Sequence, residues 1–382
     1  MKDIIHISVN PEVLIWARES IALSRNQASE KARINAKRLI QLETGEKQPA
    51  LNELKTFSKI YKRTIATLLL QSLPKEKPLP RDRRTINSKE IGGLHEKTIL
   101  AVRKARALAQ SFVELRQEMN IEFPKFNFYA SLQDNPLEVA IKVRRLLDLN
   151  QIREMSNINF ALDGYIEKVE SLGIAVFQLS LTQDGLRGFS ITDDIVPIIG
   201  IKRGGEQAHS KTFTLFHELG HILLSEGGLC DLSSKTDIKI EKWCNAFSAE
   251  VLIPTAEFLN LEIVAEHQRQ NQKTWLKKDL VELANYFHVG PLAILRSLLE
   301  NGLTTQSFYS EKHQAWNKPT FGKAKEPKGR EMHKESLKER GRTYVSLAFK
   351  AFDQNRIGMK DLSDFLGLKF SYIPKSRELL NS

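Results

Sequence analysis

The pentapeptide HELGH, residues 217–221, constrains the fold of this chain more than any other feature. It lies inside the run TFTLFHELGHILL, residues 212–224, in which apolar residues recur at steps of three and four. This spacing predicts an amphipathic helix packed into a core, with His217 and His221 one turn apart on a single face. Two imidazoles placed in this way can bind one metal ion, and Glu218 beside them can serve as a base.

Histidines satisfied by other protein groups in a core are the competing interpretation of this motif. Two histidines and a glutamate crowded onto apolar turns would, however, be costly to desolvate without a metal. A zinc ion held by three protein ligands keeps one position open for water, and Glu218 can accept the proton of that water as it attacks a carbonyl group. The motif therefore predicts a zinc site suited to peptide hydrolysis, with His217 and His221 as ligands and Glu218 as the catalytic residue.

A third zinc ligand is expected from a second element, because HExxH supplies only two. The run EKWCNAFSAEVLIP, residues 241–254, predicts a helix that ends before Pro254. It carries two acidic candidates, Glu241 and Glu250, which lie nine positions apart. Nine residues are half a turn out of phase on a helix, so only one of the two can face the metal.

Glu241 is the favoured third ligand, with Glu250 as the alternative. Asn245 and Ser248 share the helix face of Glu241, and polar groups there can hold a histidine ring in place. Glu241 also follows His221 by twenty positions, a spacing found in thermolysin-like (gluzincin) enzymes. For Glu250 the competing interpretation is an exposed carboxylate on the helix or an ion-pair partner.

Four sequence blocks in one order resemble the ImmA/IrrE family of zinc metallopeptidases. They are GLRGFSI (185–191), PIIGI (197–201), FTLFHELGH (213–221) and the segment from Glu241 to the NAFSAEVLIP run that ends at 254. The resemblance implies that His217, His221 and Glu241 bind zinc and that Glu218 is catalytic. It also implies a regulatory protease that cleaves repressors, since members of the family do so and many carry a helix-turn-helix domain.

Three β-branched or aromatic runs precede the HExxH helix, at residues 173–180, 188–191 and 195–202. Glycines and aspartates bound them, so we expect the strands of a small antiparallel sheet. An edge of such a sheet can bind an extended peptide by strand addition. Together with the HExxH helix, these strands predict a zincin-like domain of the gluzincin type.

Residues 10–72 contain several short amphipathic segments and resemble the Cro/repressor-type (XRE-like) helix-turn-helix of bacterial regulators. The turn before the third helix, Arg33-Ile34-Asn35, lacks the glycine often found there, but Asn35 can adopt left-handed backbone angles or cap the helix. A small helical bundle that binds a protein is the competing interpretation. The residues assigned to the DNA-facing surface by the resemblance are Gln27, Asn35, Lys37, Arg38 and Gln41.

The net charge of +11 favours contact with a polyanion, here a double-stranded DNA operator. Part of that charge lies in residues 312–342, where lysine and arginine alternate with glycine and proline, which indicates a solvated linker. The chain has only two cysteines, a polar start and no apolar run long enough to span a bilayer. We therefore expect a cytoplasmic protein without a membrane partner.

The predicted fold class is α+β, with an all-α N-terminal bundle and a helical C-terminal module. The predicted order is a helix-turn-helix DNA-binding domain (1–74), a helical connecting segment (75–158), a zinc metallopeptidase domain (159–305), a basic flexible linker (306–342) and a small C-terminal module (343–382). With 382 residues, the chain is long enough for two or three separate cores.

The predicted function is a DNA-binding transcriptional regulator fused to a zinc metalloendopeptidase that cleaves a partner protein, either a repressor or an antitoxin. The alternative is a non-catalytic regulator in which zinc only holds the fold, acting in a toxin–antitoxin or phage-defence pair. Both interpretations require Zn²⁺, and both leave homodimerisation open.

Overall fold

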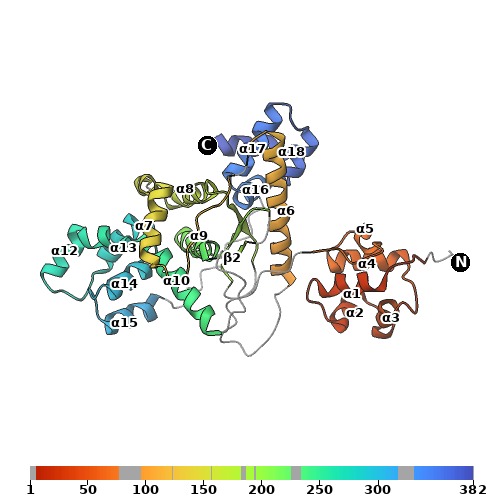
Figure 1. The fold of residues 1–382 in the computed structure, drawn as a ribbon, viewed down its shortest axis with the longest axis horizontal. Helices are drawn as coiled ribbons and strands as arrows, with labels where there is room; N and C mark the ends of the chain where they lie inside the picture. Colours follow the sequence, from red (N-terminus) through yellow and green to blue (C-terminus); the bar gives the residue numbers. More distant parts are fainter. Residues whose placement is uncertain are drawn as a thin grey trace. The chain divides into compact units, whose positions relative to one another are not determined.

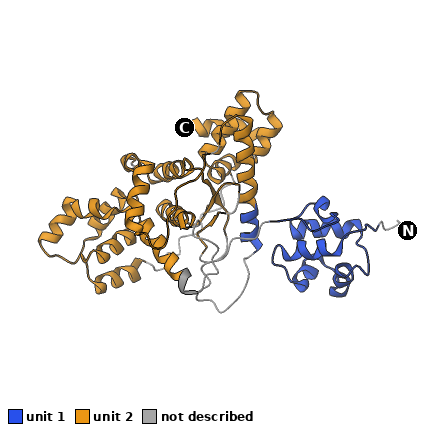
Figure 2. Ribbon diagram, in the orientation of Figure 1, with its two compact units in different colours: residues 1–103 blue, residues 104–382 orange. Residues whose placement is uncertain are grey.

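The computed structural model of the chain describes residues 6–76, 96–122, 124–155, 157–181, 186–192, 195–224, 234–316 and 331–381. The chain divides into two compact units, residues 1–103 and residues 104–382 (Figure 2). Residues 77–95, at the start of the predicted connecting segment, lie outside the described residues. Each unit is considered by itself below.

The first unit is a small helical bundle. Its helices are α1 (Pro11–Glu19), α2 (Arg25–Ala32), α3 (Ala36–Glu43), α4 (Leu51–Tyr61), α5 (Ile65–Leu68) and the start of α6 (Glu96–Glu118). The side chains of Asn10, Ser24 and Asn35 cap α1, α2 and α3 by accepting backbone N–H bonds. Leu39 and Phe57, each 1% exposed, lie in the core that joins these helices.

The turn between α2 and α3 is closed by Arg33, which has left-handed backbone angles (φ 55°, ψ 42°). Asn35 is extended and accepts a hydrogen bond from the Lys37 backbone N–H at 2.8 Å. Of the two roles open to Asn35, it therefore takes the cap, and Arg33 takes the left-handed position. A side chain with a β-carbon pays about 1–2 kcal/mol for that conformation.

Replacing Arg33 with glycine is expected to stabilise the α2–α3 pair by about 0.5–1 kcal/mol, because glycine adopts positive φ without steric cost. Native-state hydrogen exchange of the α3 amides should show the gain as slower exchange. The matched control is Lys55→Gly in the middle of α4, where glycine should cost about 1 kcal/mol. Faster exchange in Arg33→Gly would contradict the prediction.

The second unit contains a three-stranded mixed sheet. Its strands are β1 (Ala175–Leu179), β2 (Gly188–Ile191) and β3 (Ile198–Lys202), in the order β1-β3-β2. β2 pairs with β3 antiparallel, with Phe189 opposite Gly200, whereas β1 pairs with β3 parallel, with Val176 opposite Ile199. The prediction of an antiparallel sheet is therefore wrong for β1. The chain reverses direction twice, and β1 pairs with the third strand rather than the second, so the two paired strands run the same way.

Helices surround this sheet and complete the core of the second unit. The central ones are α7 (Pro136–Leu147), α8 (Ile158–Glu170), α9 (Ala208–Leu223) and α10 (Ser234–Leu252). α9 packs against β2 and β3, α8 packs against α9 and β1, and α10 packs against α9 and α7 (Figure 1). The apolar face of α9 is fully buried at Phe216, Leu219 and Leu223, as its periodicity predicts. This packing confirms the α+β class.

The remaining elements of the second unit are helical. They are η1 (Leu149–Glu154), α11 (Thr255–Asn260), α12 (Glu262–Arg269), α13 (Lys277–Tyr286), α14 (Pro291–Glu300), α15 (Gln306–Trp316), α16 (Met332–Arg340), α17 (Arg342–Asp353), α18 (Met359–Leu366), η3 (Phe370–Tyr372) and α19 (Ile373–Asn381). None of the helices in the described ranges has the length and apolarity needed to cross a membrane.

Helices α15 and α16 occupy both ends of the segment predicted as a flexible linker, residues 306–342. Its middle, residues 317–330, lies outside the described residues. α16 packs against β1, and its buried Glu339 forms ion pairs with Arg203 at 3.1 Å and Lys104 at 2.7 Å. The charges that suggest a solvated linker are here partly neutralised by partners distant in sequence, which allows a charged helix to pack.

Candidate metal centre

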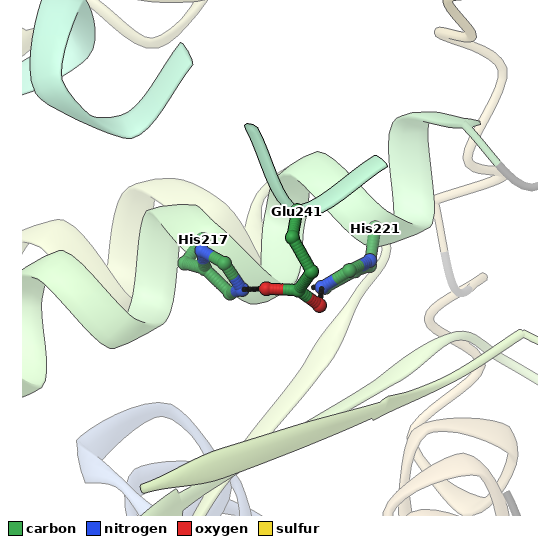
Figure 3. A group of neighbouring side chains, drawn as sticks. All are labelled: His217, His221 and Glu241. Carbon is green, nitrogen blue, oxygen red and sulfur yellow. Dashed lines mark hydrogen bonds and ion pairs between the residues drawn. The ribbon is translucent and has the colours of Figure 1, made fainter. Parts of the chain in front are cut away.

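Two helices bring three potential metal ligands together. His217 and His221 project from α9, and Glu241 projects from α10 between them (Figure 3). The Glu241 carboxylate oxygens lie 3.3 Å from each histidine Nε2, and the two Nε2 atoms are 3.1 Å apart. One potential ligand atom from each of the three residues lies within 4.8 Å of the other two. This group of two imidazoles and one carboxylate could hold a metal ion.

The His217 ring is oriented by two neighbours. Its Nδ1 lies 3.1 Å from the Asn245 side-chain oxygen, one turn beyond Glu241 on α10. The ring also stacks against Phe213, with centroids 6.2 Å apart and an interplanar angle of 28°. If Nδ1 carries the proton and donates a hydrogen bond to the Asn245 oxygen, Nε2 presents its lone pair to the centre.

The carboxylates and histidines of the centre shift one another's pKa values. Burial raises the pKa of Glu241, but the hydrogen bonds from His217 and His221 lower it more, and the net pKa lies well below that of an ordinary glutamate. Burial likewise lowers the pKa of His217, but Glu241 and Glu218 outweigh it and the net pKa is raised. Once both Nε2 atoms lose their protons, a carboxylate and two nitrogen lone pairs would face one another, and this is a favourable environment for a cation.

Glu218 is next to His217 in sequence, and its side chain lies against the sheet. The residue is only 7% exposed. Its Oε1 would lie 3.1 Å from a β-carbon built on Gly188, the first residue of β2. A carboxylate is thus held beside the ligand pair and next to the backbone of a strand at one edge of the described sheet.

Gly188 is a residue of this site that the sequence analysis did not single out. A glycine inside a strand pattern often marks a close approach of another group, and Gly188 stands at such a position in the run 188–191. A β-carbon at this position would lie 2.5 Å from Thr214 Cγ2 and 3.0 Å from the Gly200 carbonyl oxygen. Only glycine therefore lets β2 and α9 approach this closely.

Replacing Gly188 with alanine is expected to lower the free energy of unfolding by about 1–3 kcal/mol, because the added methyl group overpacks the contact with α9. Thermal unfolding of the full chain would measure the loss. The matched control is Gly204→Ala, where a β-carbon has no neighbour within 4 Å. Equal stability of the two variants would show that β2 and α9 are not tightly packed.

Glu250 and Ser248 do not join this centre. The Glu250 carboxylate accepts hydrogen bonds from the backbone N–H of Thr255 at 3.0 Å and from its hydroxyl at 2.6 Å, so it caps the start of α11. The Ser248 hydroxyl donates to the carbonyl oxygen of Cys244 in its own helix at 2.7 Å. The expectation that Ser248 supports a histidine ring is therefore wrong, whereas Asn245 does lie in the predicted position.

A cavity of about 780 Å³ adjoins the centre along α10. Asn245 and Phe213, which both contact His217, form part of its wall. Ala246, Ala249 and Val289 add apolar surface to the lining. The centre is therefore next to a space large enough for the side chains of a peptide.

Two of the five predicted DNA-facing side chains are hydrogen-bonded to acidic side chains of the first unit. Arg38 donates to both carboxylate oxygens of Glu53, at 2.8 and 2.9 Å, and the ion pair raises the pKa of Arg38. Gln41 donates to Glu46 at 2.8 Å. To form a hydrogen bond with a DNA base, each of these two side chains would first have to break its bond to the glutamate.

The other three predicted side chains are exposed at the start of α2 and α3. Gln27 forms a reciprocal capping box with Ser24, and Asn35 caps α3. The Lys37 side chain is exposed and makes no hydrogen bond or ion pair with the described residues. Lys37 is therefore the member of the set most available to a phosphate.

Comparison with known proteins bears on the part of the chain that contains the metal centre. Residues 169–299 match the family model of the IrrE N-terminal-like domain, a peptidase family. This match supports membership of that segment in the ImmA/IrrE family. No curated protein and no solved structure matches the chain.

The IrrE-like segment runs from the end of α8 to α14 and contains all three potential ligands and Glu218. Proteins of this family are typically metal-dependent, so the match supports a metallopeptidase. It extends over neither the first unit nor the helices from α15 to α19.

Proposed function

We propose that this chain is a zinc metallopeptidase that cleaves a regulatory partner protein, a repressor or an antitoxin. One observation carries the proposal: His217, His221 and Glu241 converge within 4.8 Å, and a buried glutamate lies next to the first histidine. The match to the IrrE N-terminal-like domain supports the same reaction class.

The residues present fit zinc. Catalytic zinc sites are known with two imidazole nitrogens and one carboxylate as ligands. The second ring nitrogen of His217 is hydrogen-bonded to Asn245, which leaves Nε2 for the metal. Zinc bound there would supply a Lewis acid and lower the pKa of a water molecule.

The chain's own residues would bind the peptide and move a proton. The Glu218 carboxylate would accept a proton from the attacking water and deliver it to the nitrogen of the leaving amine. The outer edge of β2 would hold the substrate backbone by strand addition, because Gly188 places this strand against Glu218.

Cleavage is tested by incubating the zinc-loaded full chain with candidate repressors or antitoxins, beginning with the products of neighbouring genes. We expect a single cut in the partner, identified by mass spectrometry, that disappears after chelation and returns when zinc is restored. An intact partner under all conditions would favour the non-catalytic regulator, in which zinc has only a structural role.

We also propose that the first unit binds double-stranded DNA through the start of α2 and α3. Capped helices joined by a short turn, with the exposed side chains of Gln27, Asn35 and Lys37, support this proposal. The N-terminal end of the second helix of such a pair is the part that contacts bases.

Replacing Lys37 with alanine is expected to weaken DNA binding and to reduce the slope of log K against log salt concentration by about 1, because one phosphate contact is lost. A mobility-shift titration with the chain's own promoter would measure it. Lys55→Ala on α4 removes the same charge and serves as control. No shift at low salt would contradict DNA binding altogether.

A further inference from the structure

A second cavity, of about 280 Å³, lies within the second unit between α8, β1 and the junction of α16 with α17. Its volume is near the lower end of the range for small-molecule sites. Its charged lining residues are Asp163 and Glu167 of α8, Lys334 and Lys338 of α16 and Arg342 of α17, and apolar side chains form much of the rest. α8, α16 and α17 flank the segment matched by the family model, so no family assignment covers this cavity as a whole.

Asp163 contributes an unpaired carboxylate to one wall. It is half-buried, and it forms no hydrogen bond or ion pair with the described residues around it. Burial raises its pKa, although Arg342 partly offsets the effect from a distance. A desolvated carboxylate without a partner is unfavourable, and a cationic group in the cavity would remove that cost.

Helices α16 and α17 contribute cationic side chains to the lining. Besides Lys334, Lys338 on α16 and Arg342 at the start of α17 line the cavity, and neither of these two forms an ion pair with Asp163. One guanidinium nitrogen of Arg342 donates to the carbonyl oxygen of Leu380 at 2.5 Å. Lys211 adds a buried positive charge behind the β1 wall, where its Nζ donates to Gln178 at 3.0 Å. The cavity therefore offers carboxylates from α8 and cationic side chains from α16 and α17.

Apolar side chains also line the cavity. Ile166 and Val176 are 4% and 1% exposed and form the buried part of the lining. Phe160 also lines the cavity but is 58% exposed, which is unusual for a large aromatic side chain. Its ring is available to a ligand as well as to solvent.

We propose that this cavity binds a zwitterionic small molecule of the amino-acid class. The ammonium group would pair with Asp163, the carboxylate would pair with Lys338 and Arg342, and an apolar side chain would pack on Phe160. Opposite charges in one cavity select a ligand with both charges, and the small volume limits it to a compact molecule. This site is independent of the proposed peptidase reaction.

Isothermal titration of the full chain with four probes tests the proposal. We expect L-leucine to bind, and N-acetyl-L-leucine, L-leucinamide and glycine to bind at least about tenfold more weakly, because each lacks one of the three contacts. Undetectable binding of L-leucine at about 10 mM would overturn the proposal. So would equal binding of L-leucinamide, which would indicate an amine or a peptide N-terminus as the occupant.

Variants locate the site. Asp163→Asn is expected to weaken L-leucine binding at least about tenfold, whereas the control Glu282→Gln on the exposed face of α13 should leave it unchanged. Lys338→Met should weaken it as well. Unchanged affinity in both Asp163→Asn and Lys338→Met would overturn the assignment, and should a variant fail to fold, the probe series on the unaltered chain still decides.

Discussion

Replacing Glu218 with glutamine is expected to reduce partner cleavage by about 10²–10⁴-fold, while zinc content and fold are retained. The amide has nearly the same shape as the carboxylate but cannot accept the proton of the attacking water. The buried position of Glu218 against Gly188 is preserved, because glutamine fills the same space. The expected signature is therefore loss of rate without loss of structure.

Cleavage of the partner over time, zinc content and thermal unfolding would be measured side by side for Glu218→Gln and for the exposed control Glu282→Gln. The control should behave like the unaltered chain. Cleavage at the normal rate by Glu218→Gln would show that this glutamate is not the base. An unchanged regulatory phenotype in cells would favour the non-catalytic regulator.

Replacing Glu241 with alanine is expected to lower zinc affinity at least about 100-fold, since loss of an outer-shell partner alone costs 10–100-fold. The carboxylate is the only anionic group among the three that lie within 4.8 Å of one another. Its removal leaves His217 and His221, one ligand fewer than the three protein ligands of a catalytic zinc site. Activity should be lost together with the metal.

The matched control is Glu250→Ala, on the same helix but hydrogen-bonded to Thr255. It should leave zinc affinity unchanged and cost about 1–3 kcal/mol of stability, because the α11 cap is lost. Competition with a chromophoric chelator would measure zinc affinity in both variants. The reverse pattern, with Glu250→Ala losing zinc, would show that the wrong carboxylate has been assigned.

On helix α10, periodicity predicts the face of each side chain but not its hydrogen-bond partner. A repeat of 3.6 residues places Glu241, Asn245 and Ser248 on one face, and the structure does direct the first two toward His217. Ser248 instead bonds a carbonyl oxygen one turn back in its own helix. Periodicity predicts the helix face on which a side chain lies, but a serine hydroxyl can instead form a hydrogen bond with a backbone carbonyl in the preceding turn.

The sheet and α16 show what local patterns omit. The β-branched and aromatic runs located the three described strands but could not tell which edge of β3 receives β1, since pairing depends on the path of the whole chain. The charged sequence of α16 is typical of a solvated linker, but in the structure Glu339 forms ion pairs with Arg203 and Lys104. Charge neutralisation between distant segments leaves no local signal.

The sequence alone predicted the HExxH helix, the order of the strands along the chain and the helix face that carries Glu241 and Asn245, because these depend on spacing within one element or between neighbouring ones. The tertiary structure decided what distant elements do to one another. It placed Gly188 against Glu218 and brought Asp163 of α8 into one cavity with Lys338 and Arg342. Such juxtapositions follow from how whole elements pack, and packing is a property of the assembled core rather than of any short run of residues.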